Sequence, residues 1–294
     1  MTRDEKEKKI RQFFICMGFF CVFIMTMIVI FLFSQALPVL HKLSLKDFLF
    51  GEFWYPTDDP ADFGIYPLIM GSFYVTLLSA CISIPLGIMT AIYIAEIADK
   101  RVREIVKPII ELLASIPSVV IGFFGMVIVA PFLQSIFDMP SGLNLFNAAL
   151  MLAFMSVPTI SSLSEDALRA VPDSLKEASL GLGATHFETI IRVMIPSALS
   201  GISTSVILGM SRAMGETMVV LMVAGGAAIV PESIFDPIRP LPATIASEMG
   251  EAPVGSDHYH ALFAIGLVLF IFTMLFNLMA AWISAKFKQR DSGF

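Results

Sequence analysis

Six long apolar stretches constrain the fold of this chain more than any other feature. A membrane-spanning helix needs about 20 consecutive apolar residues. Stretches at least that long cover residues 13–37, 65–95, 112–137, 139–164, 197–230 and 261–285, and only the fifth contains charged residues well inside it. Of the 294 residues, 15% are charged, against roughly 25% in soluble domains. We expect an all-α, polytopic membrane protein with six transmembrane helices.

Basic residues predict how these helices are oriented. Fifteen of the 19 Lys and Arg residues lie in the N-terminal tail, in the loops after the second and fourth stretches, and in the C-terminal tail. Three lie in loops on the other side, and Arg212 lies inside the fifth stretch. Since basic residues near span ends are retained in the cytoplasm, both termini are expected to be cytoplasmic.

Acidic residues collect on the opposite side. Eleven Asp and Glu residues lie in the outer loops, mainly in 40–64 and 231–259, and the first of these loops has an amphipathic pattern at 43–50. Such a face repels free anions and favours a basic docking partner. The net charge of −6 argues against nucleic-acid binding.

The Cys and His residues do not form a metal-binding pattern. Cys16, Cys21 and Cys81 lie in apolar runs. His258 and His260 lack a carboxylate or Cys at ligand spacing, and we interpret them as a solvated pair. We expect no disulfide framework, no metal site and no cofactor.

The segment 164–196 is too polar to cross a bilayer and is patterned as two short helices. Ser174-Leu175-Lys176-Glu177 and Thr185-His186-Phe187-Glu188 both match the capping box of a helix start. Gly183 favours the left-handed turn that ends one helix before the next begins. The pattern predicts a rigid elbow on the cytoplasmic side, of a shape that fits a groove on another protein.

The same residues resemble the EAA loop of ABC importer permeases. That loop reads Glu-Ala-Ala, three residues, Gly, nine residues, Ile-x-Leu-Pro, and this chain has Glu177-Ala178-Ser179, Gly183 and Val193-Met194-Ile195-Pro196 at the same spacing. The resemblance implies a permease domain at 65–288 that follows an N-terminal tail, first helix and outer loop at 1–64. It also implies that Glu177, Ala178, Gly183, Ile195 and Pro196 couple the chain to a separate ATPase.

Two charged residues interrupt the fifth stretch. Arg212 and Glu216 stand four residues apart, so on a continuous helix they would share one face. Charges at membrane depth cost roughly 2.5–3.5 kcal/mol each, which favours a functional role. Either they form an ion pair that tolerates burial, or Arg212 presents forked donors to an oxyanion while Glu216 competes and prevents trapping.

This segment is similar to the permeases of the phosphate-specific importer. The similarity rests on Arg-Ala-x-Gly-Glu-Thr-Met at 212–218 and on Ala-Ser-Ile-Pro-Ser-Val-Val-Ile-Gly-Phe at 114–123, and the Met-Val-Val after Glu216-Thr217 is closer to the C-type than to the A-type subunit. It implies a substrate path that includes Arg212, Glu216 and Thr217. Hydroxyl residues near prolines add weaker candidates: Ser115, Ser118, Ser156 and Thr159.

The resemblance also implies partners. These are an A-type permease in a heterodimer, two ATP-binding subunits, an extracytoplasmic phosphate-binding protein and the lipid bilayer of the bacterial cytoplasmic (inner) membrane. The chain has no GxxxxGK[ST] motif, which a phosphate-binding loop needs, so it is not expected to be an enzyme.

Three functions are compatible with these residues. The first is import of inorganic phosphate by alternating access, driven by the partner ATPase. The second is import of another oxyanion, such as molybdate or sulfate. The third is a sensor or scaffold that relays phosphate status, with transport secondary.

Overall fold

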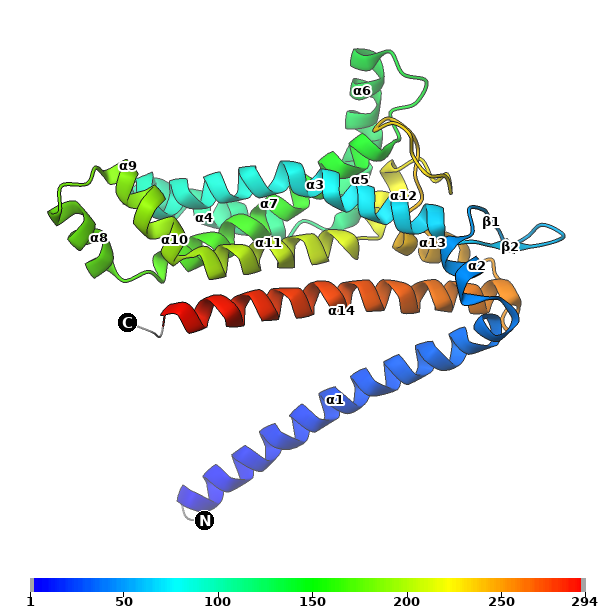
Figure 1. The fold of residues 1–294 in the computed structure, drawn as a ribbon, viewed down its shortest axis with the longest axis horizontal. Helices are drawn as coiled ribbons and strands as arrows, with labels where there is room; N and C mark the ends of the chain where they lie inside the picture. The colour runs from blue at the N-terminus through cyan, green and yellow to red at the C-terminus, as the bar shows by residue number, and fades with distance from the viewer. Residues whose placement is uncertain (1–2, 292–294) are drawn as a thin grey trace.

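Two long helices dominate one side of the molecule in the computed structural model, which describes residues 3–291. Helix α1 (Arg3–Lys42) and helix α14 (Asp257–Asp291) lie close together at one end and diverge toward the chain termini (Figure 1). Lys42 Nζ and Asp257 Oδ1 are 2.5 Å apart, and His260 Nδ1 lies 2.7 Å from the carbonyl oxygen of Gln35. These contacts join the two helices where they meet.

Three helices pack side by side in the centre of the molecule. Helix α3 (Tyr66–Ile92), which ends in the π-helical turn η1 (Tyr93–Ile97), packs along α7 (Leu145–Arg169) and α11 (Leu199–Met214). A Cβ atom on Gly87 or Gly209 would lie 2.7 or 2.6 Å from side-chain atoms of Ile160. The two glycines therefore let three helices close around one buried isoleucine, as small residues do in membrane bundles.

The third apolar stretch is broken rather than continuous. Helix α4 (Lys100–Ala114) ends before Ser115, and after Pro117 the chain continues as α5 (Ser118–Phe124), the π-helical turn η2 (Gly125–Val129) and α6 (Ala130–Phe137). The membrane-length segment is 118–137, so the predicted start at 112 is wrong. Proline disfavours helical geometry in the residue before it, which explains the break at 115–117.

The fourth predicted span is shifted, because α7 begins at Leu145 and not at residue 139. The Asn144 side chain accepts a 2.9 Å hydrogen bond from the backbone of Asn147 and caps the helix. Residues 139–144 lack charge but form a loop. Helix α7 also extends to Arg169, so that its last six residues, 164–169, lie in the predicted cytoplasmic loop.

The fifth stretch does not form one helix. Helix α11 ends at Met214, α12 (Met218–Val223) is a separate short helix, and residues 224–240 lead in irregular backbone to α13 (Leu241–Glu248). Among the described residues, five helices are long and apolar enough to cross a membrane. A sixth is counted if residues 186–197 and α11, which meet at 69°, form one bent span. The all-α, polytopic prediction is confirmed.

The two ends of the bundle carry different structures (Figure 1). The end that holds α8 (Asp173–Gly181), α9 (His186–Thr189), η3 (Ile190–Met194) and α10 (Ile195–Ser197), together with the free ends of α1 and α14, is called here the elbow end. The other, the hairpin end, carries α2 (Leu45–Phe50) and strands β1 (Trp54–Tyr55) and β2 (Asp62–Phe63). The strands pair antiparallel, with Trp54 opposite Phe63.

Candidate functional site

Arg212 and Glu216 lie on either side of a helix break. Arg212 is in the last turn of α11, and Glu216 precedes α12, where its Oε1 accepts a 3.4 Å hydrogen bond from the Val219 amide. The prediction that they share one helix face is therefore wrong. Helix α11 ends at Met214, with Gly215 at its C-cap (φ −89°), and this break separates the two charges.

The Arg212 guanidinium has a hydroxyl partner instead of a carboxylate. Its Nη1 donates to Thr159 Oγ1 of α7 at 3.2 Å, and the Arg212 side chain is partly accessible to solvent. No ion pair within residues 3–291 includes Arg212 or Glu216. Because arginine carries five N–H donors, most of them remain available to bind an anion.

Of the other residues predicted to line the substrate path, Thr217 directly follows Glu216, and Ser115 and Ser118 lie at the break between α4 and α5. Thr217 Oγ1 donates locally to the Gly215 carbonyl at 3.4 Å, and Ser115 Oγ donates to the Leu112 carbonyl at 2.7 Å. Ser118 begins α5, which packs against α12. The structure thus brings the α4–α5 break toward the segment that follows Glu216, while Arg212 itself bonds to α7.

The elbow forms as two short helices with a glycine turn between them. Gly183 has φ +87°, and Thr185 and Glu188 form a complete capping box at the start of α9. The predicted box at Ser174 is wrong, because the N-cap of α8 is Pro172, two residues earlier, and it has no side-chain hydrogen bond. Proline fixes φ near the helical value and can set a helix start in place of a capping side chain.

The elbow presents an apolar tip that the motif did not indicate. The side chains of Leu182 and Phe187, on either side of Gly183, are 90% and 70% exposed. Glu177 and Ala178 lie on α8, where no residue is buried, while Ile195 and Pro196 begin α10. Large apolar side chains on an otherwise polar projection mark a surface for protein contact. The sequence did not indicate this surface, because single apolar residues such as Leu182 and Phe187 are common in polar loops.

A charged cluster ties α4 to α7 at the elbow end. Lys107 Nζ contacts Glu165 Oε2 and lies 3.0 Å from Asp166 Oδ1, and Arg169 Nη1 lies 3.4 Å from Glu165 Oε1. The side chain of Glu165 is 2% exposed. The hydrogen bond to Glu165, followed by the one to Asp166, raises the pKa of Lys107 despite partial burial.

Glu248 organises the hairpin end. Its carboxylate accepts hydrogen bonds from Trp54 Nε1 at 3.0 Å and Arg239 Nη1 at 2.6 Å, and it lies 2.9 Å from His258 Nε2. The interpretation of His258 and His260 as a solvated pair is therefore wrong, since His258 contacts Glu248 and His260 contacts α1. These partners are distant in sequence, so spacing could not indicate them.

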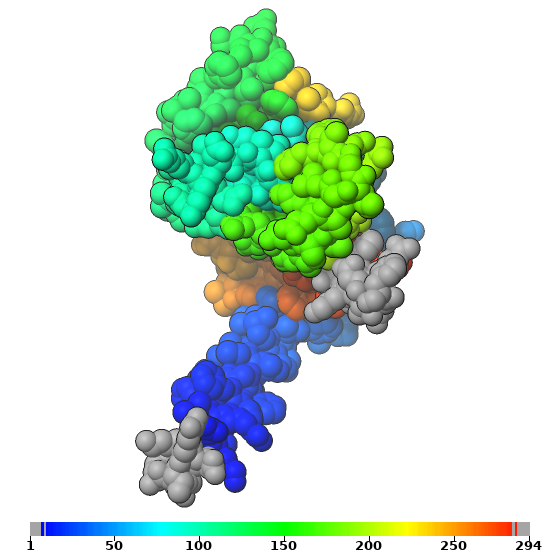
Figure 2. All heavy atoms as spheres, turned by 90° about the vertical axis from the view of Figure 1, so that its left-hand side faces the viewer, coloured from blue at the N-terminus to red at the C-terminus, as the bar shows by residue number. Residues whose placement is uncertain are grey.

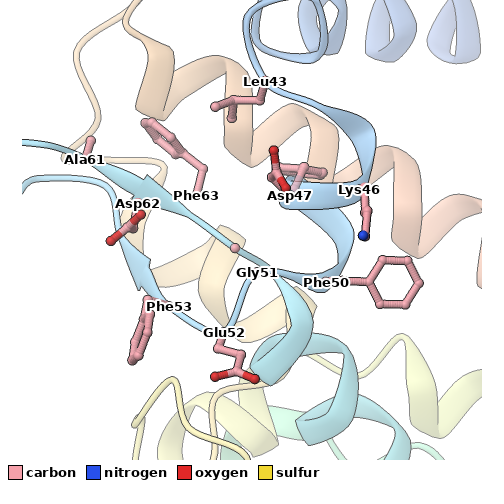
Figure 3. A pocket seen from close by; sticks show the side chains of 12 residues that line it. Leu43, Lys46, Asp47, Phe50, Gly51, Glu52, Phe53, Ala61, Asp62 and Phe63 are labelled. Carbon is pink, nitrogen blue, oxygen red and sulfur yellow. The ribbon is translucent and has the colours of Figure 1, made fainter.

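A pocket of about 290 Å³ lies beside this cluster, between α2 and the hairpin. Figure 3 shows Asp47 on α2 and Phe63 and Asp62 on β2, while the Lys46 side chain lies beside Phe50 on the side of α2 away from the strands. The predicted amphipathic helix at 43–50 is confirmed as α2, with Phe48 buried. The lining of the pocket includes the carboxylates of Asp47, Glu52 and Asp62.

Comparison with known proteins identifies a common family. A family model described as "Binding-protein-dependent transport system inner membrane component" matches residues 83–289. The probable ABC transporter permease protein YqgH of Bacillus subtilis is 41% identical over 250 residues, which cover 85% of this chain and 81% of that protein. The phosphate transport system permease protein PstC of Mesorhizobium japonicum is 36% identical over 262 residues, which cover 83% and 79%.

Solved structures show the same fold. A bacterial alginate ABC transporter in complex with an alginate pentasaccharide-bound periplasmic protein contains a chain that matches with a TM-score of 0.63 and 16% identity, over 95% of this chain and 96% of that chain. The MetNI methionine ABC transporter in an inward-facing conformation matches with a TM-score of 0.56 and 21% identity, over 76% and 94%. This likeness shows the ABC importer permease fold.

Proposed function

The chain belongs to the binding-protein-dependent transport permeases, and on that basis we propose that it is a membrane subunit of an ATP-driven importer of inorganic phosphate. Several relatives carry the name phosphate transport system permease protein PstC, including those of Mesorhizobium japonicum, Haemophilus influenzae and Pasteurella multocida, at 31–36% identity. The run Arg212-Ala213-Met214-Gly215-Glu216-Thr217, which resembles the phosphate-specific permeases, favours the same substrate.

The proposal rests mainly on the exposure and the hydrogen-bond partner of Arg212. Its guanidinium is accessible, donates to the neutral Thr159 hydroxyl at 3.2 Å, and has no carboxylate partner among the described residues. A guanidinium matches the oxygens of a phosphate with two parallel hydrogen bonds. Arg212 therefore receives the anion after it is released into the membrane domain.

Glu216 makes this binding reversible. It lies four residues from Arg212 across the break at Gly215, and its carboxylate bonds only weakly, at 3.4 Å, to the Val219 amide. A change in the geometry of the break moves this carboxylate relative to the guanidinium, where it repels the anion and competes for the donors. Alternating access then exposes Arg212 to one side of the membrane at a time.

ATP hydrolysis by a separate partner drives this cycle. The elbow carries the coupling motif and the exposed side chains of Leu182 and Phe187, which fit an apolar cleft on an ATP-binding subunit. Two such subunits, a homologous A-type permease and an extracytoplasmic phosphate-binding protein complete the complex. The binding protein docks at the acidic hairpin end.

The elbow end faces the cytoplasm in this proposal, together with both termini. The loops and tails on that side hold fifteen of the 19 basic residues, in agreement with retention of positive charge inside the cell. The protein is thus a multi-pass component of the bacterial cytoplasmic membrane. The acidic loops face outward.

Uptake by proteoliposomes that hold the complete complex tests the substrate. Labelled phosphate, molybdate and sulfate are supplied on the outside with the binding protein, and ATP is supplied inside. We expect ATP-dependent accumulation of phosphate alone. Accumulation of molybdate or sulfate instead would assign a different oxyanion, and normal assembly without any uptake would favour a sensor or scaffold.

A further inference from the structure

Helix α8 is held away from the membrane core. The structure describes all nine residues of α8 and none of them is buried. A cavity of about 690 Å³ separates it from the start of α11, lined by Ala167, Val171, Leu175, Ala198 and Gly201 among others. Burial of apolar surface is what fixes most helices to a core, so α8 depends on its side-chain links.

Two polar side-chain links join α8 to the rest of the elbow end. Lys176 Nζ lies 2.5 Å from Glu96 Oε2, and Ser179 Oγ lies 3.0 Å from Thr189 Oγ1 of α9. The second link stays within the elbow. The first connects α8 to η1, the end of the membrane helix α3 (Figure 1).

The Glu96–Lys176 ion pair is shielded from water. The side chain of Glu96 is 5% exposed and that of Lys176 is 28% exposed. Figure 2 looks onto the elbow end, where the blue-green residues of α4 and the yellow-green residues of α8 and α9 lie side by side. A shielded pair is screened less by salt than a surface pair, and removal of one partner leaves an uncompensated charge.

The backbone turn that carries Glu96 is supported by α4. Glu96 lies in a π-helical turn, a feature frequent at functional sites. Arg103 of α4 donates through Nε to the Ile94 carbonyl and through Nη2 to the Ala95 carbonyl, both at 2.8 Å. The guanidinium thus satisfies carbonyl groups that the end of a helix leaves free.

Helix α3 connects this turn to the hairpin end. It packs along α7 for much of its length, and near its first turns Ser72 Oγ accepts a 2.9 Å hydrogen bond from the Leu241 amide of α13. Helix α3 runs directly into η1 and is thus the continuous backbone link between Glu96 and the hairpin end.

We propose that Glu96 is a positioning residue that transmits movement of α8 to α3 through its ion pair with Lys176. This inference rests on the proposed function, because it assumes that an ATPase moves α8. When α8 shifts, the charge pair pulls η1 with it, and α3 carries the displacement across the membrane domain. Without the pair, α8 moves over the cavity beneath it and ATP is hydrolysed without transport.

The test measures ATP hydrolysis and phosphate uptake in the same proteoliposomes. Glu96→Gln and Lys176→Met keep the side-chain sizes and remove one charge each, and the double variant Glu96→Lys/Lys176→Glu restores an opposite pair. We expect the single variants to hydrolyse ATP in the presence of binding protein and to lose roughly 5-fold or more of the uptake per ATP. The double variant should recover most of that ratio.

Lys42→Met is the control for the loss of a lysine charge, since it breaks another close Lys–carboxylate pair, with Asp257, which is exposed and lies at the hairpin end. It should leave the ratio of uptake to hydrolysis unchanged. Single variants with the wild-type ratio would overturn the inference. If the single variants do not assemble, the double variant decides: an assembled, coupled double variant supports the link, and an assembled, uncoupled one overturns it.

Failure of this inference differs from failure of the proposed function. If the wild-type complex accumulates no phosphate, the proposed function fails before any variant is compared. If the wild-type complex transports phosphate and Glu96→Gln does so with the same ATP requirement, only the role of Glu96 is contradicted.

Discussion

Arg212 at the end of α11 donates through Nη1 to the Thr159 hydroxyl of α7, at 3.2 Å. This contact fixes a cation beside a helix break and leaves its charge unneutralised. A carboxylate in the same position would form an ion pair and reduce the attraction for an anion. A hydroxyl orients the guanidinium and preserves its charge.

Thr159→Val should therefore weaken phosphate handling without removing it. The substitution keeps the shape and deletes the acceptor, and a hydrogen bond of this kind contributes about 0.5–1.5 kcal/mol. We expect a loss of roughly 2- to 10-fold in uptake at limiting phosphate. Thr204→Val is the control, because Thr204 bonds within α11, to the Ser200 carbonyl at 2.8 Å. An equal loss in both variants would contradict a specific role for Thr159.

Gly209→Ala should destabilise the central bundle. The added Cβ would lie 2.6 Å from Cγ1 of Ile160, and such overpacking typically costs about 1–3 kcal/mol. Thermal unfolding in detergent should show the loss, and Ile160→Ala in the same chain should remove part of it. Gly181→Ala has no atom within 4 Å of the new Cβ and should not lower the midpoint; a decrease there equal to that of Gly209→Ala would contradict the packing argument.

Lys107→Met should destabilise the contact between α4 and α7. The buried Glu165 carboxylate then keeps only Arg169 at 3.4 Å, and an under-satisfied charged group costs about 1–3 kcal/mol. The double variant Lys107→Met/Glu165→Gln should recover much of the stability, because both charges are removed. Chemical unfolding of the purified protein measures each step.

The pH dependence of this contact follows from the raised pKa of Lys107. A raised pKa means that the stabilising contribution is complete below the ordinary lysine value and is lost only as the pH rises through the higher value. The difference in unfolding midpoint between wild type and Lys107→Met should therefore stay constant from about pH 6 to pH 9. A difference that disappears near neutral pH would contradict the assignment.

Gly183→Trp should uncouple the chain from its ATPase while leaving it inserted. Gly183 has φ +87°, and a Cβ atom added there would meet nothing within 4 Å. A bulky side chain at this position therefore does not clash with the rest of the chain. It would strain the turn by about 1–2 kcal/mol and obstruct the surface beside Leu182. Membrane abundance should remain near that of wild type while binding-protein-stimulated ATP hydrolysis and uptake fall; normal uptake would contradict the role of the elbow.

Local patterns in the sequence predicted much of this architecture. The apolar stretches indicated the membrane helices, and the Thr185 capping box and the left-handed Gly183 are confirmed. Motif spacing led to the family that the comparisons confirm. These features depend on residues within a few positions of one another, which a sequence displays directly.

Features that depend on competition between neighbouring helix signals, or on contacts between residues far apart in the sequence, could not be predicted. Pro172 sets the start of α8 ahead of Ser174, and Gly215 separates Arg212 from Glu216. The loop 139–144 has no charged residue, so its sequence resembles part of a membrane span, although Asn144 caps α7 and the helix begins only at Leu145. The contacts of Glu248 with His258 and of Lys176 with Glu96 join separate elements, so no local spacing reveals them.

Uptake of labelled phosphate by the complete complex with Arg212→Gln tests the central claim most directly. Glutamine keeps a hydrogen-bond donor near Thr159 but removes the charge that attracts the anion. The account predicts an assembled complex with ATPase activity and with phosphate uptake reduced to near background. An assembled Arg212→Gln complex that imports phosphate at the wild-type rate would show that Arg212 is structural and would contradict the account.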